Sequence, residues 1–330
     1  MTWWQVLLFP FAIIYDIVTR CRNWLYDLGW FKSHTFPAVK IISVGNLSVG
    51  GTGKTPMIQY LVRLGLEKKW SMAILSRGYG RKTKGIIEAT QHTTSDDIGD
   101  ECSMYVQEFG QSVPVFVSEN RVEGVKAILA RYPTIQLVLL DDGFQHRRLK
   151  PDFQILLTKF TRPFWKDFLV PSGLLRESRQ GYRRADHMIL TKCTEGAAGE
   201  IPVSIETSRT TIEYAMPKLL QGALETQVVG VSGLADNRLF FAHLSEQFSV
   251  QKVFGFKDHH DYTEVDVSEI VRVCKEKKAT MLCTEKDMVK LRAFSELENI
   301  SWGYIPVRVK FLSNESLLLE KIDELMQRIV

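Results

Sequence analysis

Residues 48–55, with the sequence SVGGTGKT, have the types and spacing of a loop that holds the phosphates of a nucleotide. Its glycines leave the backbone free to turn N–H groups towards phosphate oxygens. In such a loop the Lys54 ammonium bridges the β- and γ-phosphates, and the Thr55 hydroxyl ligates Mg²⁺. We therefore expect ATP and Mg²⁺ as cofactors, with Lys54 also catalytic. The expected binding residues are Ser48, which stands where glycine is usual, with Gly50, Gly51, Thr52, Gly53, Lys54 and Thr55.

A second set of chemical groups follows the apolar run 136–142, QLVLLDD, which predicts a buried strand ending in two carboxylates. Beside a phosphate-binding loop, an aspartate at such a strand end reaches the magnesium ion directly or through water. Asp141 and Asp142 are therefore candidate metal ligands, and the sequence leaves open which of them contacts the ion.

Alternating strands and helices are expected to position these groups. The loop lies between a β-branched run at 39–45 and a helical pattern that begins near Met57. Further strands are predicted at 72–75, 113–117, 153–157 and 188–190, with a helix at 120–132. This alternation indicates an α/β fold with a mostly parallel sheet of the P-loop NTPase type, covered on both faces, with ligands at the carboxyl ends of its strands.

The alternation starts again after Thr211, with apolar strands predicted in 228–234, 277–287 and 304–307. A length of 330 residues also fits two α/β units. We therefore expect a P-loop domain over 36–207, a connector over 208–220 and a second, smaller α/β domain over 221–330.

The amino-terminal stretch is unusually apolar and aromatic. Residues 3–15 are WWQVLLFPFAIIY, too short a run to span a bilayer, and further aromatic and basic residues follow as far as Lys32. Aromatic rings settle at a membrane–water boundary, and arginines meet anionic headgroups there. We interpret residues 1–35 as a helical segment that lies in the membrane interface; a core helix packed on the first domain is the alternative.

Composition excludes several other classes of protein. A net charge of +4, with basic residues in small separate clusters, does not predict binding to nucleic acid. The five cysteines are odd in number and widely spaced, which favours a reducing compartment and no structural zinc. Nothing in the sequence predicts a protein partner.

Several motifs together resemble the tetraacyldisaccharide 4'-kinases of Gram-negative bacteria over almost the whole chain. They are SVGNLSVGGTGKTP (43–56), SRGYGR (76–81), GDE (99–101), ENR (119–121), LLDDGFQHRRL (139–149), PSGLLRE (171–177), FKDHHDY (256–262) and TEKDMVKL (284–291). The resemblance implies transfer of the γ-phosphoryl group of ATP to the 4'-hydroxyl of a tetraacyl glucosamine disaccharide 1-phosphate. It also implies a peripheral, monotopic protein at the cytoplasmic face of the inner membrane.

The resemblance further implies roles for individual residues. Asp100 resembles the family's catalytic carboxylate and His259 its partner in the second domain, although His260 stands beside it. An acid near the γ-phosphate can accept the proton of the sugar hydroxyl. We expect this pair to meet only when the cleft between the domains closes. The motifs also place Glu177 with the metal ligands, and they imply that the substrate is bound by Tyr79, Arg121, His146 and Arg176.

Two other functions remain open at this stage. One is a membrane-associated switch NTPase, but the N/T-K-x-D motif that selects guanine is absent: Thr194 stands where Asp is needed after Thr191-Lys192, and the 284–287 run is shifted by one residue. The other is a kinase of a small soluble substrate, in which the aromatic amino terminus is only structural.

Overall fold

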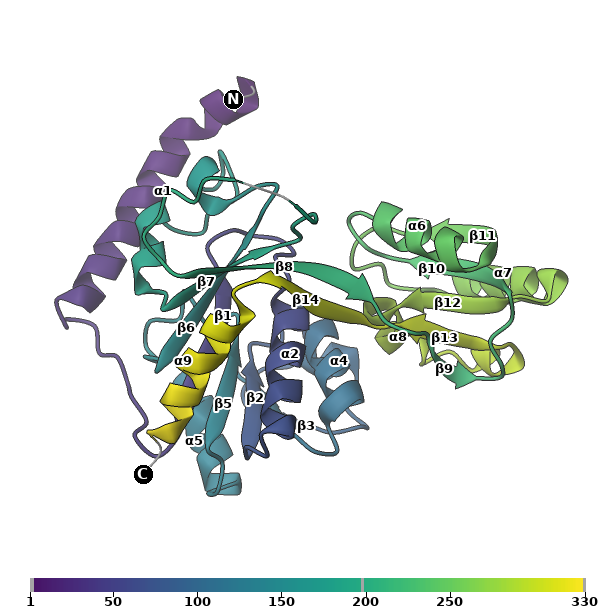
Figure 1. Ribbon diagram of the computed structural model, residues 1–330, viewed down its shortest axis with the longest axis horizontal. Coiled ribbons are helices and arrows are strands. Elements are labelled where there is room, and N and C mark those ends of the chain that lie inside the picture. Colours follow the sequence, from purple (N-terminus) through teal and green to yellow (C-terminus); the bar gives the residue numbers. More distant parts are fainter. Residues whose placement is uncertain (1–2, 197–198, 329–330) are drawn as a thin grey trace.

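The structure, a computed structural model, describes residues 3–196 and 199–328. Its larger sheet has the strand order β14-β8-β7-β6-β1-β5-β2-β4-β3 (Figure 1). Strands β8 to β4 in this order pair in parallel, whereas β14 and β3 are antiparallel to their neighbours. The bounds are β1 Lys40–Asn46, β2 Met72–Ser76, β3 Ile87–Ala89, β4 Val115–Val117, β5 Leu137–Asp141, β6 Phe153–Lys159, β7 His187–Thr191, β8 Thr207–Tyr214 and β14 Val307–Ser313. The predicted parallel α/β sheet is confirmed.

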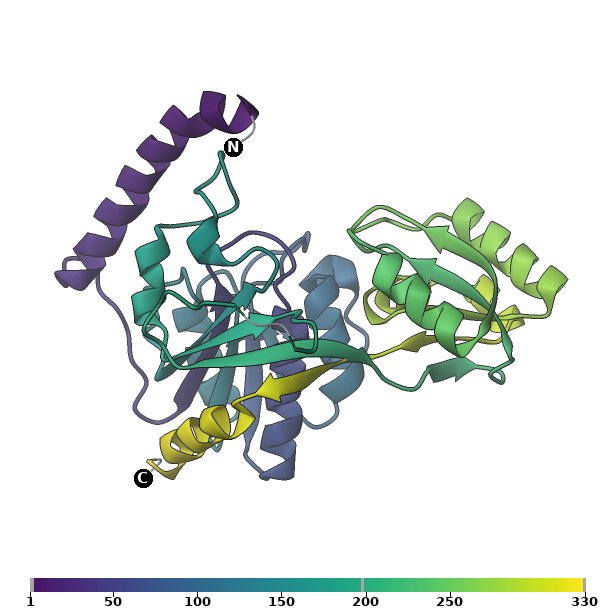
Figure 2. The same ribbon diagram turned by 45° about the horizontal axis from the view of Figure 1, so that its top comes forward.

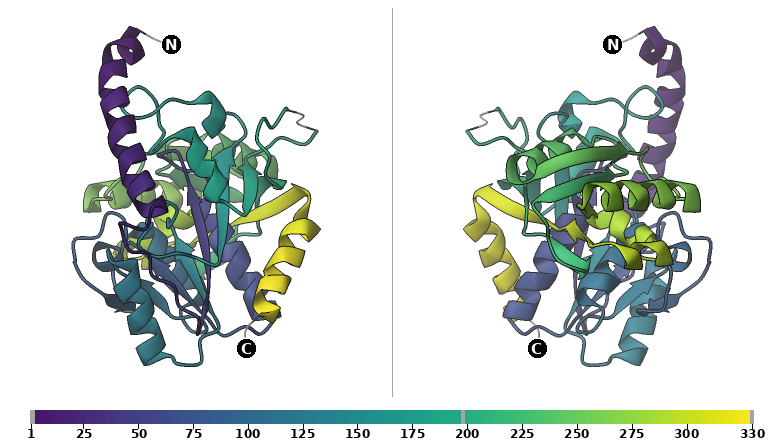
Figure 3. Two further views of the ribbon diagram at one scale, coloured as in Figure 1. Left: turned by 90° about the vertical axis from the view of Figure 1, so that its left-hand side faces the viewer. Right: turned by 90° about the vertical axis from the view of Figure 1, so that its right-hand side faces the viewer.

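Helices cover both faces of this sheet because successive residues of each buried strand point to opposite sides. Ile42 of β1 packs with Met57 of α2 and Ile322 of α9 on one face, whereas Ile41 packs with Val125 of α5 on the other. Figure 3 shows α2 and α9 together on one side of the sheet. The bounds are α2 Lys54–Glu67, α3 Ser95–Ile98, α4 Asp100–Phe109, α5 Arg121–Arg131 and α9 Glu315–Gln327; short 3₁₀ turns span Phe164–Lys166 (η1) and Arg179–Arg184 (η2).

A smaller sheet with the order β11-β10-β12-β13-β9 forms the other end of the molecule (Figure 2). Its apolar core includes Val231 of β10, Ile270 of α7 and Met288 of α8. The bounds are β9 Lys218–Gln221, β10 Gln227–Ser232, α6 Arg238–Gln247, β11 Ser249–Gly255, α7 Glu264–Lys277, β12 Thr280–Thr284, α8 Glu285–Leu291, η3 Ser295–Asn299 and β13 Trp302–Ile305.

The boundary between the two units differs from the expected one, which placed a connector at 208–220 and the second domain at 221–330. Most of that connector is strand β8, which lies in the larger sheet beside β14. Residues 307–327 also return to the larger sheet, because Leu318, Ile322 and Met326 form an apolar stripe on α9 that is buried over α2. The smaller sheet is thus an insertion between β8 and β14.

The amino-terminal helix α1, Trp3–Asp27, lies along the side of the larger sheet that is remote from the smaller one (Figures 1 and 2). Polar contacts hold it: the Tyr15 hydroxyl donates to the Arg176 carbonyl at 2.8 Å, and Asn23 Nδ2 donates to Glu177 Oε2 at 2.7 Å. Its outer side exposes Trp3, Val6, Leu7, Phe11, Ile14, Ile17 and Val18. Across the described residues, no helix has the length and apolar sequence needed to cross a membrane.

Candidate active site

The predicted phosphate-binding loop runs from the end of β1 to the first turn of α2. Gly50 (φ +94°) and Gly53 (φ +92°) adopt left-handed conformations that a side chain disfavours. Thr52 is held between them: its hydroxyl accepts from Asn46 Nδ2 at 2.7 Å, and its carbonyl accepts from the Thr191 hydroxyl at 2.8 Å. The loop therefore opens on the helix N-terminus, where Lys54 is the first residue and free backbone N–H groups attract phosphate.

The two predicted strand-end carboxylates have different surroundings. Asp142 faces cations: Lys54 Nζ lies 3.6 Å from its Oδ1, and Arg176 Nη1 donates to both of its carboxylate oxygens at 3.0 and 2.9 Å. Burial raises the pKa of Asp142, but the charges of Lys54 and Arg176 outweigh burial and hold that pKa below its ordinary value. Asp142 therefore stays ionised and keeps both cations at the mouth of the loop.

Asp141 is fully buried, and only one of its oxygens is paired. Its Oδ2 accepts from the Ser76 hydroxyl at 3.0 Å, whereas its Oδ1 has no hydrogen-bond partner among the described residues. Burial, and after it the charge of Glu101, raises the pKa of Asp141 to about 7. The Ser43 hydroxyl and Asn46 Oδ1, on the paired strand β1, are buried and unpaired too. Buried polar atoms without partners are costly, so this point suits a cation or a polar ligand.

These residues fit a magnesium ion that is held together with a nucleotide. In the part of the chain that the structure describes, no group of three or more His, Cys, Asp or Glu residues is arranged to hold a metal ion by itself. Mg²⁺ characteristically takes one or two carboxylates and completes its shell with phosphates and water. Thr55 and Asp141 offer such a partial set, whereas Asp142 is already engaged by two cations.

The other predicted metal ligand, Glu177, has a full set of protein partners. Its side chain is buried and accepts from Arg184 Nη2 at 2.7 Å, Asn23 Nδ2 at 2.7 Å and Gln145 Nε2 at 3.1 Å. Glu177 thereby ties α1 to the larger sheet, and its role as a metal ligand stays a prediction.

The two residues predicted for proton chemistry are in contact. Asp100 is the first residue of α4, and its Oδ2 lies 3.1 Å from Nδ1 of His259, which belongs to the smaller-sheet unit. A side chain on the preceding Gly99 (φ +86°) would place its Cβ 2.4 Å from the Tyr79 carbonyl, so glycine is needed there. The expectation was that the pair meets only when the cleft between the domains closes; in the structure the two side chains lie in contact.

Direct packing between the two units holds the pair in contact. Met104 of α4 lies in the apolar core of the smaller sheet. Gln59 Nε2 of α2 donates to Glu285 Oε1 of α8 at 2.9 Å in a buried position. The helices that carry Lys54 and Asp100 therefore both contact the second unit.

Lys290 of α8 is a site residue that sequence reasoning missed. Its Nζ lies 3.4 Å from Asp100 Oδ2 and donates to the carbonyls of His259 at 3.3 Å and of His260 at 3.1 Å. His259 has a φ of +59°, a conformation that needs support in a residue with a side chain. Lys290 supplies it, and its place in the TEKDMVKL motif was the available signal.

The neighbouring histidine is engaged elsewhere. His260 Nε2 lies 3.1 Å from Asp266 Oδ2, and its ring stacks on Phe256 with centroids 4.5 Å apart. Of the two histidines that the sequence left open, His259 is the one that contacts Asp100. Tyr79, another predicted site residue, is exposed, and its ring centroid lies 6.3 Å from that of His259.

A positively charged zone surrounds the remaining predicted substrate residues. Burial, and after it the charges of Arg121, Arg148, Arg77 and Arg22, lowers the pKa of His146 to about 4, so the ring is neutral at pH 7. The Arg121 guanidinium is buried and donates to the Ser118 and Glu119 carbonyls, yet its Nε has no partner among the described residues. Converging guanidinium groups of this kind suit an anionic ligand.

Comparisons relate the whole chain to known kinases. The profile of a family described as Tetraacyldisaccharide-1-P 4'-kinase matches residues 4–327. A tetraacyldisaccharide 4'-kinase of Cytophaga hutchinsonii is 38% identical over 98% of this chain and 96% of its own length. The enzyme of that name from Flavobacterium psychrophilum is 39% identical over 98% and 97%. A crystal structure of "apo" form LpxK from Aquifex aeolicus in complex with ATP superposes with a TM-score of 0.80, at 32% identity, over 98% of this chain and 99% of its own.

Proposed function

This chain belongs to the tetraacyldisaccharide 4'-kinase family, and on that premise we propose that it transfers the γ-phosphoryl group of ATP to the 4'-hydroxyl of a tetraacyl glucosamine disaccharide 1-phosphate. The observation that carries the proposal is the pairing of the loop lysine, Lys54, with the strand-end Asp142, beside the buried Asp141 with its unpaired oxygen. This is the arrangement that phosphoryl transfer from a magnesium nucleotide needs.

The loop residues bind and orient the nucleotide. The phosphates lie against the backbone of residues 48–53, and Lys54 turns from Asp142 to the β- and γ-phosphate oxygens. When bound, Mg²⁺ neutralises charge that develops on the transferring group, with Thr55 and Asp141 as its protein ligands. Arg176 remains on Asp142 and keeps that carboxylate from competing for the lysine.

Asp100 and His259 prepare the acceptor. The bond from the 4'-oxygen to the γ-phosphorus forms as the bond to the β,γ-bridging oxygen breaks, and ADP leaves with the electron pair of that bond. The hydroxyl proton passes to the Asp100 carboxylate, which His259 and Lys290 hold in place from the second unit. Catalysis here rests mostly on positioning and charge.

The lipid acceptor is bound through its anionic and sugar groups. The zone of Arg22, Arg77, Arg121 and Arg148 around His146 suits a sugar phosphate. The exposed Tyr79 ring, beside His259, offers a surface for a sugar. Tyr79, Arg121, His146 and Arg176 are our proposed substrate residues.

The same lipid explains the exposed apolar side of α1. Seven large apolar side chains, from Trp3 to Val18, are exposed on the outer side of that helix. Large apolar side chains that gather on one exposed surface mark a contact with a membrane or with another protein. We place α1 in the plane of the membrane interface, with the protein monotopic at the cytoplasmic face of the inner membrane, where ATP is available.

A direct assay tests the function. Purified protein is incubated with Mg²⁺, ATP labelled at the γ-phosphate and the tetraacyl disaccharide 1-phosphate, and label is measured in the lipid product. We expect a bis-phosphorylated lipid that forms with ATP and is absent from a Lys54→Ala control. Nucleotide hydrolysis without labelled lipid would favour a switch NTPase, and transfer to a soluble sugar with none to the lipid would favour a small-molecule kinase.

A further inference from the structure

A groove runs along α1 on the side that faces residues 167–184. Two adjoining cavities of about 350 Å³ each form it, and Arg20, Ser178 and Gln180 line both. Each cavity has the size of a small-molecule pocket, for which about 300–1,000 Å³ is typical. Together they extend from the carboxyl half of α1 towards its amino half.

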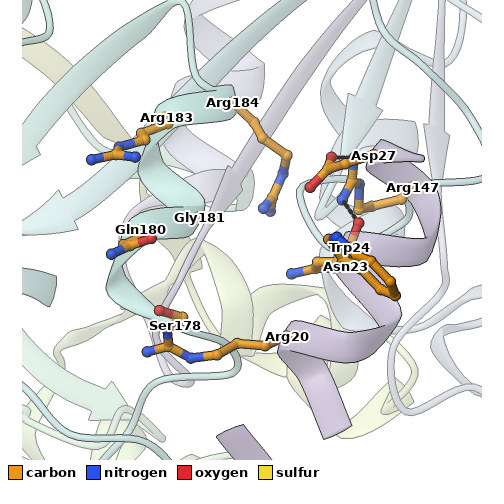
Figure 4. Close-up of a pocket in the computed structure, with 10 residues that line it drawn as sticks. All are labelled: Arg20, Asn23, Trp24, Asp27, Arg147, Ser178, Gln180, Gly181, Arg183 and Arg184. Atoms are coloured by element: carbon orange, nitrogen blue, oxygen red, sulfur yellow. Dashed lines mark hydrogen bonds and ion pairs between the residues drawn. The ribbon is translucent and has the colours of Figure 1, made fainter. Parts of the chain in front are cut away.

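One end of the groove is basic (Figure 4). The side chains of η2 lie on one side of the space and those of α1 on the other. Arg20, Arg147, Arg183 and Arg184 line this cavity, and Asp27 is the acidic residue among those that line it. Arg183 makes no ion pair or hydrogen bond with the described residues, and Arg184 Nε is buried without a partner. The other three guanidinium groups are paired, that of Arg20 with Asp16, that of Arg147 with Asp27 and that of Arg184 with Glu177. The excess of positive charge in this cavity favours a phosphate.

The other end of the groove has apolar walls, although charged residues such as Asp16 and Arg179 also line it. Phe9, Ala12 and Ile13 of α1 face Phe168 and Leu169 across this second cavity. Phe9 and Ile13 are 41% and 48% exposed, so the apolar wall is open at its outer edge. A basic pocket that continues into an apolar channel has the polarity of a phospholipid, with its phosphate at one end and its acyl chain at the other.

The groove is separate from the phosphoryl-transfer site. The residues that line its two cavities include none of the P-loop, Asp142, Arg121 or His146. The buried Glu177 stands between: Asn23 and Arg184 of the groove donate to it, whereas the side chain of the adjacent Arg176 pairs with Asp142. A ligand in the groove would therefore leave the proposed substrate residues free.

We propose that this groove binds a phospholipid of the surrounding bilayer, one with an anionic headgroup, as a second lipid distinct from the substrate. The phosphate lies in the cavity that Arg20, Arg147, Arg183 and Arg184 line, and one acyl chain lies between α1 and residues 168–169. The inference rests on the proposed membrane association of α1. The bound lipid would contact both α1 and residues 168–184, and would thereby help to hold α1 in the membrane interface.

Photocrosslinking tests the proposal without any need for turnover. The full-length protein is mixed with phosphatidylcholine vesicles that contain phosphatidylglycerol with a diazirine in one acyl chain, and crosslinked peptides are mapped by mass spectrometry. We expect crosslinks concentrated at Phe9, Ile13, Phe168 and Leu169. Arg183→Ala should lower their yield about fivefold, since one arginine at an anionic surface contributes about 1 kcal/mol. Gln180→Trp, which fills the groove without a change of charge, should lower it as well.

Lys166→Ala is the matched control, because it removes one exposed positive charge from the same segment without lining either cavity. An equal loss in this control would overturn the proposal in favour of diffuse surface charge. The side chains of Val6, Phe11 and Ile14 face the bilayer and should be crosslinked whether or not the groove is filled. If Gln180→Trp lowered the crosslinks in the groove no more than those at these three residues, the proposal would be overturned too. Displacement of the probe by equimolar tetraacyl disaccharide phosphate would show that the groove belongs to the substrate. Each of these crosslinking results can be read even if the kinase assay shows no labelled lipid product. The groove proposal and the proposed function can therefore be refuted independently of each other.

Discussion

The contact between Asp100 and His259 allows a sharp test, since it predicts a large effect on turnover and a small one on stability. The Asp100 side chain is 13% exposed and that of His259 is 48% exposed. A pair this open to solvent contributes only about 0–1 kcal/mol to folding. A general base contributes about a hundred- to ten-thousandfold to kcat, which is about 2.7–5.4 kcal/mol of barrier. Alanine at either position should therefore disable turnover in a protein whose melting temperature falls by only a few degrees.

The assay is a double-mutant cycle on kcat at saturating ATP and lipid, with nucleotide affinity measured separately. If the residues act as one unit, Asp100→Ala combined with His259→Ala is little worse than the poorer single variant. His260→Ala is the matched control, because that ring bonds Asp266 instead and should leave kcat nearly unchanged. Fully multiplicative losses would refute joint action, and a normal kcat in Asp100→Ala would remove that carboxylate from the mechanism.

Four further changes have defined outcomes. Lys54→Ala should leave thermal unfolding intact but lower turnover by about a thousandfold or more, since the ammonium offsets charge on the transferring group. Deletion of residues 1–30 should move the protein from the membrane fraction to the supernatant in a flotation assay; circular dichroism checks that it is still folded. Lys290→Met should lower kcat about ten- to a hundredfold through misplacement of Asp100, whereas Lys286→Met on the same helix should not. Burial lowers the pKa of His187 to about 4, so on acidification this histidine takes up a proton in the unfolded chain before it does so in the folded one. The free energy of unfolding in urea should therefore fall as the pH drops from about 6.5 towards 4. In His187→Gln it should fall less steeply over the same range.

Sequence reasoning reached the larger sheet because its strands are short apolar runs between clear helical patterns. The strand predicted at 39–45 is observed at Lys40–Asn46, and the one at 136–142 is Leu137–Asp141. It missed β8 and β14, because β8 alternates between buried and partly exposed residues at its start and β14 has no fully buried residue, so neither strand gives a continuous apolar run. Pairing between strands about a hundred residues apart leaves no local signal.

The candidate site was predictable where a motif is local. The phosphate-binding loop and the strand-end acids fall in single runs of sequence, and their positions agree with the structure. The contact of Lys290 with Asp100 and with the 259–260 carbonyls depends on how α8 packs against α4, which no spacing along the chain encodes. The different environments of Asp141 and Asp142 likewise arise from the fold, since Asp141 is the last residue of β5 whereas Asp142 follows the strand in a left-handed turn with a φ of +49°.

The insertion of the smaller sheet between β8 and β14 fixes an order of events as the chain leaves the ribosome. Residues 218–305 hold every strand of the smaller sheet, so that unit can be complete while the larger sheet still lacks β14 and α9. Until residues 307–327 emerge, the apolar face of α2 that α9 covers stays open to solvent. The nucleotide-binding unit is therefore the last to complete its fold, although most of its residues are synthesised first. Over that interval the nascent chain is most prone to aggregate and to bind chaperones.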